Sequence, residues 1–389
     1  MDTVLATLLS LARLPMRQLQ LVLNQSQGDI FGLTRLQQGQ CPVISGATIP
    51  WLPPRLSAAP SEIFRNRRQL GSIENEKPSP TTLTPPTPPT PPVMIWYEHL
   101  SKAGGTSFCK LAKKNMPRKE VPSYYCMPSE PGGRLDARVG QWDNEQLANY
   151  YLREKKTLVS NEWEPFPQQR LKMQQYVSGT KQPLLLLLVT TLREPLNRLV
   201  SAYRFWGVLH NPILQKPPPL RRWLKRMEAR ARRDAASPSG IGKGNITGRG
   251  DFIAHVGRPN FATWKFSGGA LPLPRRILGR YSRRRSYPWA QEEPLWREPF
   301  ETAVRTLARF DLAIPLEELS KHTGPLRELL GWSHFEATQF VPSGEVVNAV
   351  ATAELPPEDH DQLWDDNKLD MVLYNWVRAM YLTRIYCSM

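Results

Sequence analysis

The chain has 389 residues, a hydrophobic content of 40% that can supply a sizeable core, and a formal net charge of +16. This length allows one large domain with extensions or two domains, and the charge favours anionic partners such as nucleotides, nucleic acid, anionic glycans or a membrane surface. The four cysteines have neither metal-ligand spacing nor the density of a disulfide scaffold, so we expect no metal. Cys109 and Cys126 can pair in an oxidising compartment, although spacing alone does not decide this.

Residues 1–76 are expected to form a disordered N-terminal extension. Its apolar run VLATLLSLARL is shorter than the roughly 18 residues of a transmembrane helix, so a weak anchor, a transit peptide and unstructured chain are all open. Residues 77–92, KPSPTTLTPPTPPTPP, cannot form helix or sheet ladders, because proline lacks the amide donor and fixes φ. They are predicted to be a semi-rigid linker or stem, which places the folded domain over 93–389.

From Val93 onward, strand-like and helix-like segments alternate, which predicts an α/β fold with a central parallel sheet flanked by helices. The expected strands cover 93–99, 156–161 and 183–193, and the expected helices cover 106–114, 194–206 and 220–233. The run PLLLLLVTTLR is typical of a central strand buried on both faces. A basic insertion is expected at about 212–250, and a long helix capped by Asn367 closes the chain.

The segment EHLSKAGGTSF joins the first expected strand to the first expected helix. A strand, a glycine turn and a helix direct backbone N–H groups at an anion, and the helix dipole assists. Gly104 and Gly105 permit close approach, while Thr106 and Ser107 add hydroxyl donors. Lys102 supplies a cation, although a Walker A motif would place its lysine after the glycines. The plainer alternative is a glycine turn with capping hydroxyls and a surface lysine.

The segment TTLREPLNRLVSAY makes a second turn of this kind. Arg193 leaves the central strand at its carboxyl end, where ligands of open α/β sheets gather, and arginine can grip a phosphate with two hydrogen bonds. Ser201 lies two helical turns further on. The plainer alternative is a structural ion pair of Arg193 with Glu194 or a neighbouring acid, and a small residue packed at Ser201.

Together the two turns resemble the sulfotransferase superfamily, and most of all the Golgi carbohydrate branch that contains the heparan sulfate 2-O- and 6-O-sulfotransferases. That family reads H-x-P-K-T-G-G-T-[ST]-[FL] and L-R-[ED]-P-x-x-R-x-x-S-x-[YW], and this chain reads HLSKAGGTSF and LREPLNRLVSAY. NFATWKFSG is a weaker match to the family's N-x-x-T-R-x-L-x-G. The resemblance covers about 93–386. Ser101, Ala103 and Trp264 depart from it, and Trp264 leaves the role of its segment open.

The resemblance implies a P-loop-like sulfotransferase fold and metal-free use of 3′-phosphoadenosine 5′-phosphosulfate as co-substrate. The residues that would hold the 5′-phosphosulfate are Lys102, Ala103, Gly104, Gly105, Thr106 and Ser107. Arg193 and Ser201 would hold the 3′-phosphate. The implied acceptor is a hydroxyl-bearing molecule, above all a glycan, with no nucleic acid as partner. The implied location is the Golgi lumen or membrane, and another organellar lumen is the alternative.

Two residues are predicted to carry the chemistry. Lys102 would stabilise the departing oxygen, by analogy with phosphoryl-transfer clamps. The heparan sulfate enzymes use a histidine base just before the central strand, but LVSNEWEPF at that place contains none. Glu162 is therefore the predicted general base, with Glu164 as runner-up and two ordinary loop carboxylates as the alternative. His99 is either another base or, as in the family, structural.

Three other functions stay open. A P-loop-type small-molecule kinase would use the same fold physics, but its lysine motif and a magnesium-binding aspartate are not evident. A non-catalytic basic protein would bind any polyanion with steep salt dependence. The third is a catalytically inactive member of the sulfotransferase family, which the absent histidine allows.

Overall fold

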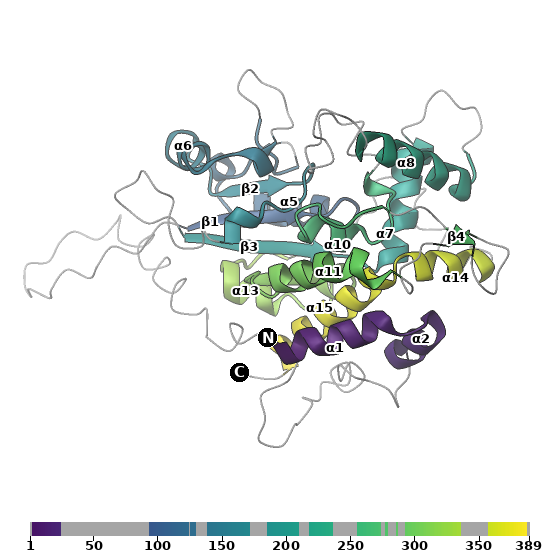
Figure 1. Cartoon of the computed structure of the whole chain (residues 1–389). Coiled ribbons are helices and arrows are strands. Elements are labelled where there is room, and N and C mark those ends of the chain that lie inside the picture. The colour runs from purple at the N-terminus through teal and green to yellow at the C-terminus, as the bar shows by residue number, and fades with distance from the viewer. Residues whose placement is uncertain are drawn as a thin grey trace, which may run out of the picture.

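The computed structural model describes residues 2–24, 93–123, 125–129, 138–171, 185–209, 218–235, 255–273, 277–278, 285–286, 292–335 and 357–386. At its centre is a parallel sheet in the order β2-β1-β3-β6 (Figure 1). The strands are β1 (Val93–His99), β2 (Leu158–Asn161), β3 (Leu185–Leu192) and β6 (Leu312–Pro315). The predicted α/β class with a central parallel sheet flanked by helices is confirmed.

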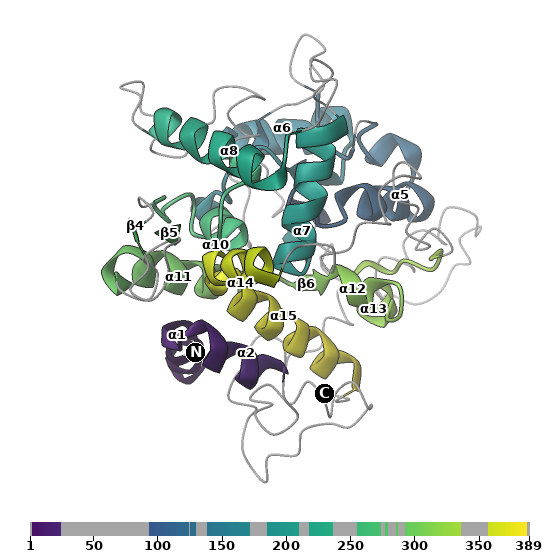
Figure 2. The ribbon, with the colours of Figure 1, turned by 90° about the vertical axis from the view of Figure 1, so that its right-hand side faces the viewer.

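The sheet has a hydrophobic core on each of its two faces. Successive side chains of a strand point to opposite faces, so each strand contributes to both cores. Val93, Ile95 and Tyr97 enter one hydrophobic core, whereas Met94 and Trp96 enter the other. The first core is completed by α5 (Gly105–Asn115) and α13 (Gly324–Leu330), and the second by α10 (Phe261–Phe266), α11 (Glu293–Leu307) and α15 (Lys368–Tyr386). Figure 2 shows α5 on one side of the molecule and α10 and α11 on the other.

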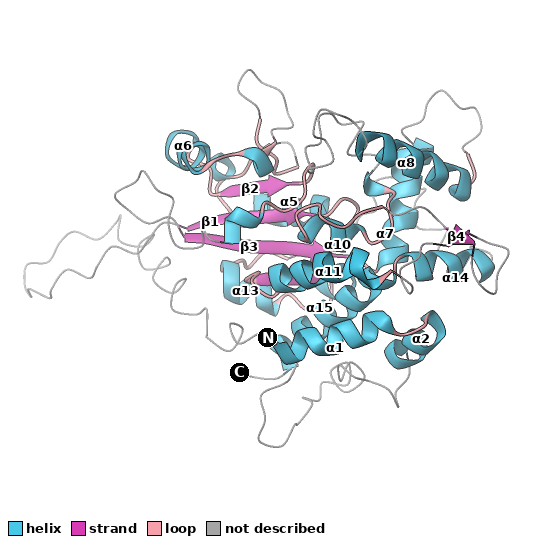
Figure 3. Cartoon of the chain, viewed as in Figure 1, coloured by secondary structure: helices cyan, strands magenta, loops and turns pink. Residues whose placement is uncertain are grey.

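The other elements surround this centre (Figure 3). The helices are α6 (Asn144–Glu154), α7 (Pro195–Ala202), α8 (Leu220–Ala235), α12 (Leu316–Leu319) and α14 (Pro357–Asp366). The shorter elements are the 3-10 turns Arg118–Glu120, Val139–Gln141 and Gln168–Leu171, the π-helix η6 (Tyr203–Leu209), and an antiparallel pair of β4 (Ile277–Leu278) and β5 (Arg285–Ser286). The basic helix predicted at 220–233 is α8, while much of the expected insertion at 212–250 lies outside the described residues.

Residues 2–24 differ from the disordered extension that we expected over 1–76, whereas residues 25–76 lie outside the described residues. Residues 2–24 form α1 (Asp2–Arg13) and α2 (Met16–Asn24), which lie beneath α11 and α15 in Figure 1. The apolar stripe of α1 enters the second core, and Arg13 donates to both carboxylate oxygens of Glu293 at 2.9 and 2.6 Å. The apolar run therefore packs as one face of an amphipathic helix. Residues 77–92 lie outside the described residues, and none of the described helices meets the length and hydropathy of a membrane span.

The strand order creates a switch point between β1 and β3. The chain leaves β1 toward β2 on one side, and leaves β3 toward β6 on the other. The loops that follow β1 and β3 therefore flank the crevice in which open α/β sheets bind ligands. These are the two turns that the sequence singled out. A disulfide between Cys109 and Cys126, with a Cα–Cα distance of 5.7 Å, ties α5 to the segment after it.

Candidate active site

The loop after β1 is a tight turn that requires glycine. The backbone adopts the left-handed conformation at Lys102 (φ +66°) and again at Gly104 (φ +98°). Between them, Ala103 N donates to Leu100 O at 3.0 Å and closes the turn. A Cβ atom on Gly105 would lie 1.8 Å from His99 Nε2. Gly104 thus allows the backbone conformation, and Gly105 leaves room for the buried imidazole beneath the loop.

Helix α5 begins directly after this turn. Its first intrahelical bond runs from Phe108 N to Gly104 O at 3.0 Å, so the amides of Gly105, Thr106 and Ser107 precede any helical acceptor. The hydroxyls of Thr106 and Ser107 lie half-buried in the same turn. This end of α5 has the donors and the dipole direction that suit an anion. The amide of Ala103, by contrast, is used within the loop.

The loop after β3 meets the first loop through Arg193, whose Nη1 donates to Lys102 O at 3.4 Å. The neighbouring Glu194 does not serve mainly as its ion-pair partner. The Glu194 carboxylate caps α7 instead, accepting from Leu196 N at 3.1 Å and from Asn197 N at 2.7 Å. Ser201 lies in the last turn of α7 and is half-buried. The structure thus brings Arg193 to the Lys102 loop.

The helix predicted over 194–206 changes its winding at the site. It is α-helical only to Ala202 and continues as the π-helix η6, a rare form that recurs at functional sites. The altered winding accompanies a contact between η6 and the first loop, in which the Phe205 ring centroid lies 3.8 Å from Lys102 Nζ. This cation–π contact connects the Lys102 ammonium to η6.

The site cations lie in a partly desolvated setting. Burial lowers the pKa of Lys102 to about 8, with Arg193 adding to the fall and Glu162 opposing it. Burial also lowers the pKa of Arg193, against the attraction of Glu317 and Glu194. Both cations would therefore be stabilised by a bound anion, and Lys102 lies within the electrostatic reach of both Arg193 and Glu162.

Glu162 lies beside His99, with 3.4 Å between His99 Nδ1 and Glu162 Oε2. The two side chains are only 7% and 12% exposed, and burial lowers the pKa of His99, which favours a neutral imidazole. Glu164 is placed differently, because its Oε2 accepts from Gly140 N at 2.8 Å. Burial raises the pKa of Glu164 to about 7. Of the two predicted carboxylates, Glu162 is therefore the one that contacts the imidazole beneath the loop after β1.

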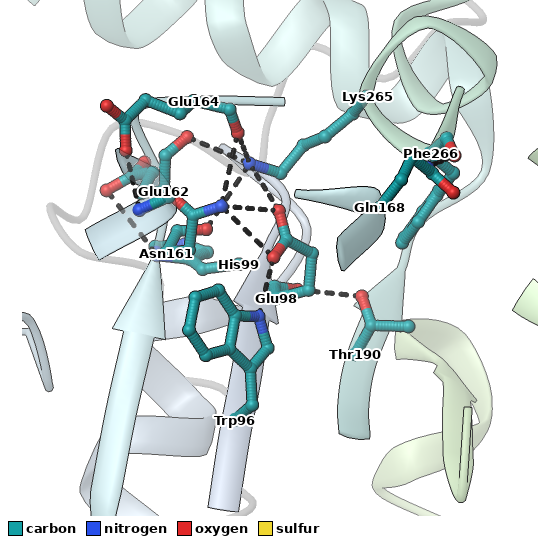
Figure 4. Close-up of polar contacts among 11 residues, drawn as sticks. Trp96, Glu98, His99, Asn161, Glu162, Glu164, Gln168, Thr190, Lys265 and Phe266 are labelled. Carbon is teal, nitrogen blue, oxygen red and sulfur yellow. Dashed lines mark hydrogen bonds and ion pairs between the residues drawn. The ribbon is translucent and has the colours of Figure 1, made fainter. Parts of the chain in front are cut away.

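Sequence reasoning missed a buried ionic cluster just behind this pair. Lys265 on α10 and Glu98 on β1 are fully buried and form an ion pair of 2.8 Å (Figure 4). Asn161 Nδ2 donates to both carboxylate oxygens of Glu98 at 3.0 and 3.1 Å, and Trp96 Nε1 donates to Oε2 at 2.9 Å. The sequence contains one indication of this cluster, because Glu98 is the only acidic residue in the otherwise apolar run before His99.

The segment NFATWKFSG joins this cluster to the rest of the domain. Trp264, which stands where the resembled sulfotransferase pattern has arginine, is buried and stacks on the His255 ring with 4.6 Å between centroids. Ser101 and Ala103, the two departures in the first loop, are also buried. All three departures therefore fill interior positions.

No family model matches the sequence, and no curated protein or solved structure shows significant similarity to it. Among the described residues, no group of three or more histidine, cysteine or acidic side chains is arranged to hold a metal ion.

Proposed function

We propose that the protein is a sulfotransferase of P-loop-like fold that moves the sulfuryl group of 3′-phosphoadenosine 5′-phosphosulfate to an acceptor hydroxyl on a carbohydrate. The observation that carries this proposal is the meeting of two cationic strand-end loops at the sheet's switch point, with Arg193 bonded to the Lys102 loop at the start of α5. The close sequence match of both loops to the sulfotransferase turns supports this choice of anion.

In this proposal each loop holds one end of the donor. The first loop, with Lys102 and the amides and hydroxyls of Thr106 and Ser107, holds the 5′-phosphosulfate, while Arg193 and Ser201 hold the 3′-phosphate. A helix N-terminus and a bidentate guanidinium are the two means by which α/β proteins grip phosphate without a metal. The half-buried position of Lys102 and Arg193 strengthens both contacts, because screening by water is reduced.

The transfer itself needs one base and one electrophilic group. The Glu162 carboxylate accepts the proton of the acceptor hydroxyl while the acceptor oxygen forms its bond to sulfur. The bond from sulfur to the bridging oxygen breaks, and Lys102 stabilises the negative charge that this oxygen acquires. His99, held neutral by burial, contacts the carboxylate and fixes its orientation. The products are the sulfated acceptor and adenosine 3′,5′-bisphosphate.

A lumenal location fits this proposal. The disulfide between Cys109 and Cys126 is stable in an oxidising compartment such as the secretory pathway, and is rare in the cytosol. The Golgi lumen, where glycans are available as acceptors, is the compartment that we propose.

The test is a transfer assay with the full chain, ³⁵S-labelled donor and a panel of glycans in the presence of EDTA. We expect label in at least one glycan and a loss of about a hundredfold or more in Glu162→Gln and Lys102→Ala, in line with the usual worth of a general base. Transfer of γ-phosphate from Mg·ATP, without sulfuryl transfer, would instead identify a kinase. Salt-dependent polyanion binding that survives loss of Lys102 and Arg193 would identify a non-catalytic protein.

A further inference from the structure

The buried ion pair of Lys265 and Glu98 adjoins the Glu162–His99 pair, and its lysine lies on α10. This helix of six residues is held at its first turn by Asp370 of α15, whose carboxylate accepts from Ala262 N, Thr263 N and Thr263 Oγ1, each at 2.8 Å. In return, Asn260 Oδ1 accepts from Asp370 N at 3.2 Å. The side chain of Asn367, which was predicted to cap α15, accepts a hydrogen bond at its Oδ1 from the backbone N–H of Asn260. These reciprocal bonds fix α10 to the longest helix of the domain.

From this fixed helix, Lys265 reaches into the segment after β2. Its Nζ donates to the carbonyl oxygens of Asn161, Glu162 and Glu164 at 3.3, 3.1 and 2.6 Å, in addition to its ion pair with Glu98. Figure 4 shows these oxygens converging on one nitrogen. The residue that carries the proposed base therefore has its own carbonyl bonded to Lys265.

The other half of the ion pair fixes the histidine. Glu98 directly precedes His99 on β1, and its carbonyl accepts from Thr190 Oγ1 at 2.7 Å while its carboxylate binds Asn161. One ion pair thus connects the two chain segments that meet at the 3.4 Å contact between His99 Nδ1 and Glu162 Oε2.

A buried ion pair is a poor means of gaining stability, because the desolvation of both charges offsets their attraction. Apolar side chains would fill the same volume without that cost. Lys265 also donates to three backbone carbonyls within residues 161–164. These bonds favour one backbone conformation of 161–164, which indicates that the ion pair positions this segment.

We propose that the Lys265–Glu98 ion pair is a positioning device, which holds the 161–164 loop against His99 and so aims the Glu162 carboxylate at the acceptor. Neither residue touches the reacting atoms. The catalytic part of this inference rests on the proposed function, whereas the positional part does not. It also gives the NFATWKFSG segment a role, which is to brace the base-bearing loop.

The test compares Glu98→Gln/Lys265→Met with wild type in the full chain. The double change removes both buried charges but keeps an oxygen acceptor for Trp96 and Asn161. The matched control is Glu318→Gln/Arg378→Met, which removes the 2.5 Å ion pair between α12 and α15. Hydrogen exchange by mass spectrometry then reports on the peptide over residues 158–166. We expect its exchange to accelerate at least tenfold in the first variant and to match wild type in the control.

Kinetics supply the second measurement. We expect kcat of the double variant to fall ten- to a hundredfold, with the KM for the donor and the affinity for adenosine 3′,5′-bisphosphate within twofold of wild type. Wild-type exchange in 158–166, or an equal loss of nucleotide affinity, would overturn the positioning role. If wild type itself binds no nucleotide, the proposed function fails while the exchange comparison still decides the positional claim. If the double variant does not fold, Lys265→Met alone carries the same exchange comparison, because it removes the three carbonyl bonds and the remaining Glu98, whose pKa burial raises, can take up a proton.

Discussion

The affinity of the site for its nucleotide is predicted to fall as the pH rises through 8. Burial lowers the pKa of Lys102 to about 8, so the free site carries its ammonium charge at pH 7 and loses most of it by pH 9. An ammonium of that pKa is about 90% charged at pH 7 and about 10% charged at pH 9. If the nucleotide binds the charged form and keeps it charged, its Kd rises about tenfold over this range, or about 1.4 kcal/mol.

Isothermal titration calorimetry with adenosine 3′,5′-bisphosphate at pH 7, 8 and 9 measures this directly. The second phosphate ionisation, near pH 6, is already complete over the range. Two buffers with different ionisation enthalpies should show an uptake of about 0.5 proton per binding event near pH 8. Lys102→Arg is the control, because a guanidinium stays charged, and its Kd should be nearly flat. A flat profile in wild type, or the same slope in Lys102→Arg, would refute the assignment of Lys102.

Three further predictions concern the framework of the site. Gly105→Ala puts a Cβ 1.8 Å from His99 Nε2. Because overpacking costs about 1–3 kcal/mol, this variant should have a Tm several degrees lower and bind the nucleotide more weakly. Gly324→Ala, whose Cβ meets nothing within 4 Å, is the control and should change neither property, so equal Tm values for the two variants would contradict the packing around Gly105. The raised pKa of Glu164, about 7, makes the folded state bind the proton more tightly, so its carboxylate destabilises the fold increasingly as the pH rises from about 4.5 to 7. Glu164→Gln should therefore raise Tm at pH 8 by an amount equivalent to about 1–3 kcal/mol and have little effect at pH 5, and a pH-independent difference would be evidence against this. Deletion of residues 2–24 exposes the apolar surface against which Leu8 is fully buried. We expect this deletion to lower Tm by at least 5 °C. An unchanged Tm would show that α1 does not stabilise the core.

The sheet was predictable because its strands are continuous apolar runs. Strand β1 has the predicted bounds of Val93–His99, while β2 begins two residues later than predicted and β3 ends at Leu192, one residue earlier than predicted. The helix after β3 was placed correctly, but its change to a π-helix at Tyr203 was not, because hydrophobic periodicity does not report a local rewinding. The helices at the N-terminus were missed for a related reason. An amphipathic stripe such as that of α1 indicates burial without naming the surface that buries it.

The two loops of the candidate site were visible in the sequence because short motifs encode local geometry, such as the positive φ at Gly104. The cluster behind them was not visible. Glu98, Asn161 and Lys265 come from three distant parts of the chain. The register of β1 with β2 pairs Glu98 with Asn161, and the packing of α10 brings Lys265 to them. Long-range ion pairs of this kind leave a single trace in a sequence, which is a charge where an apolar residue is expected.

The proposed function requires that the loops carrying Lys102 and Arg193 form one donor-binding site. Calorimetric titration of the full chain with adenosine 3′,5′-bisphosphate in EDTA tests this, for wild type and for Arg193→Ala, with adenosine 5′-monophosphate as the comparison ligand. We expect tight, metal-independent binding to wild type, a hundredfold or greater loss in Arg193→Ala, and weak binding of the monophosphate to both proteins. A folded wild-type protein that does not bind the bisphosphate, or an Arg193→Ala variant that binds it equally well, would show that the two loops do not form such a site.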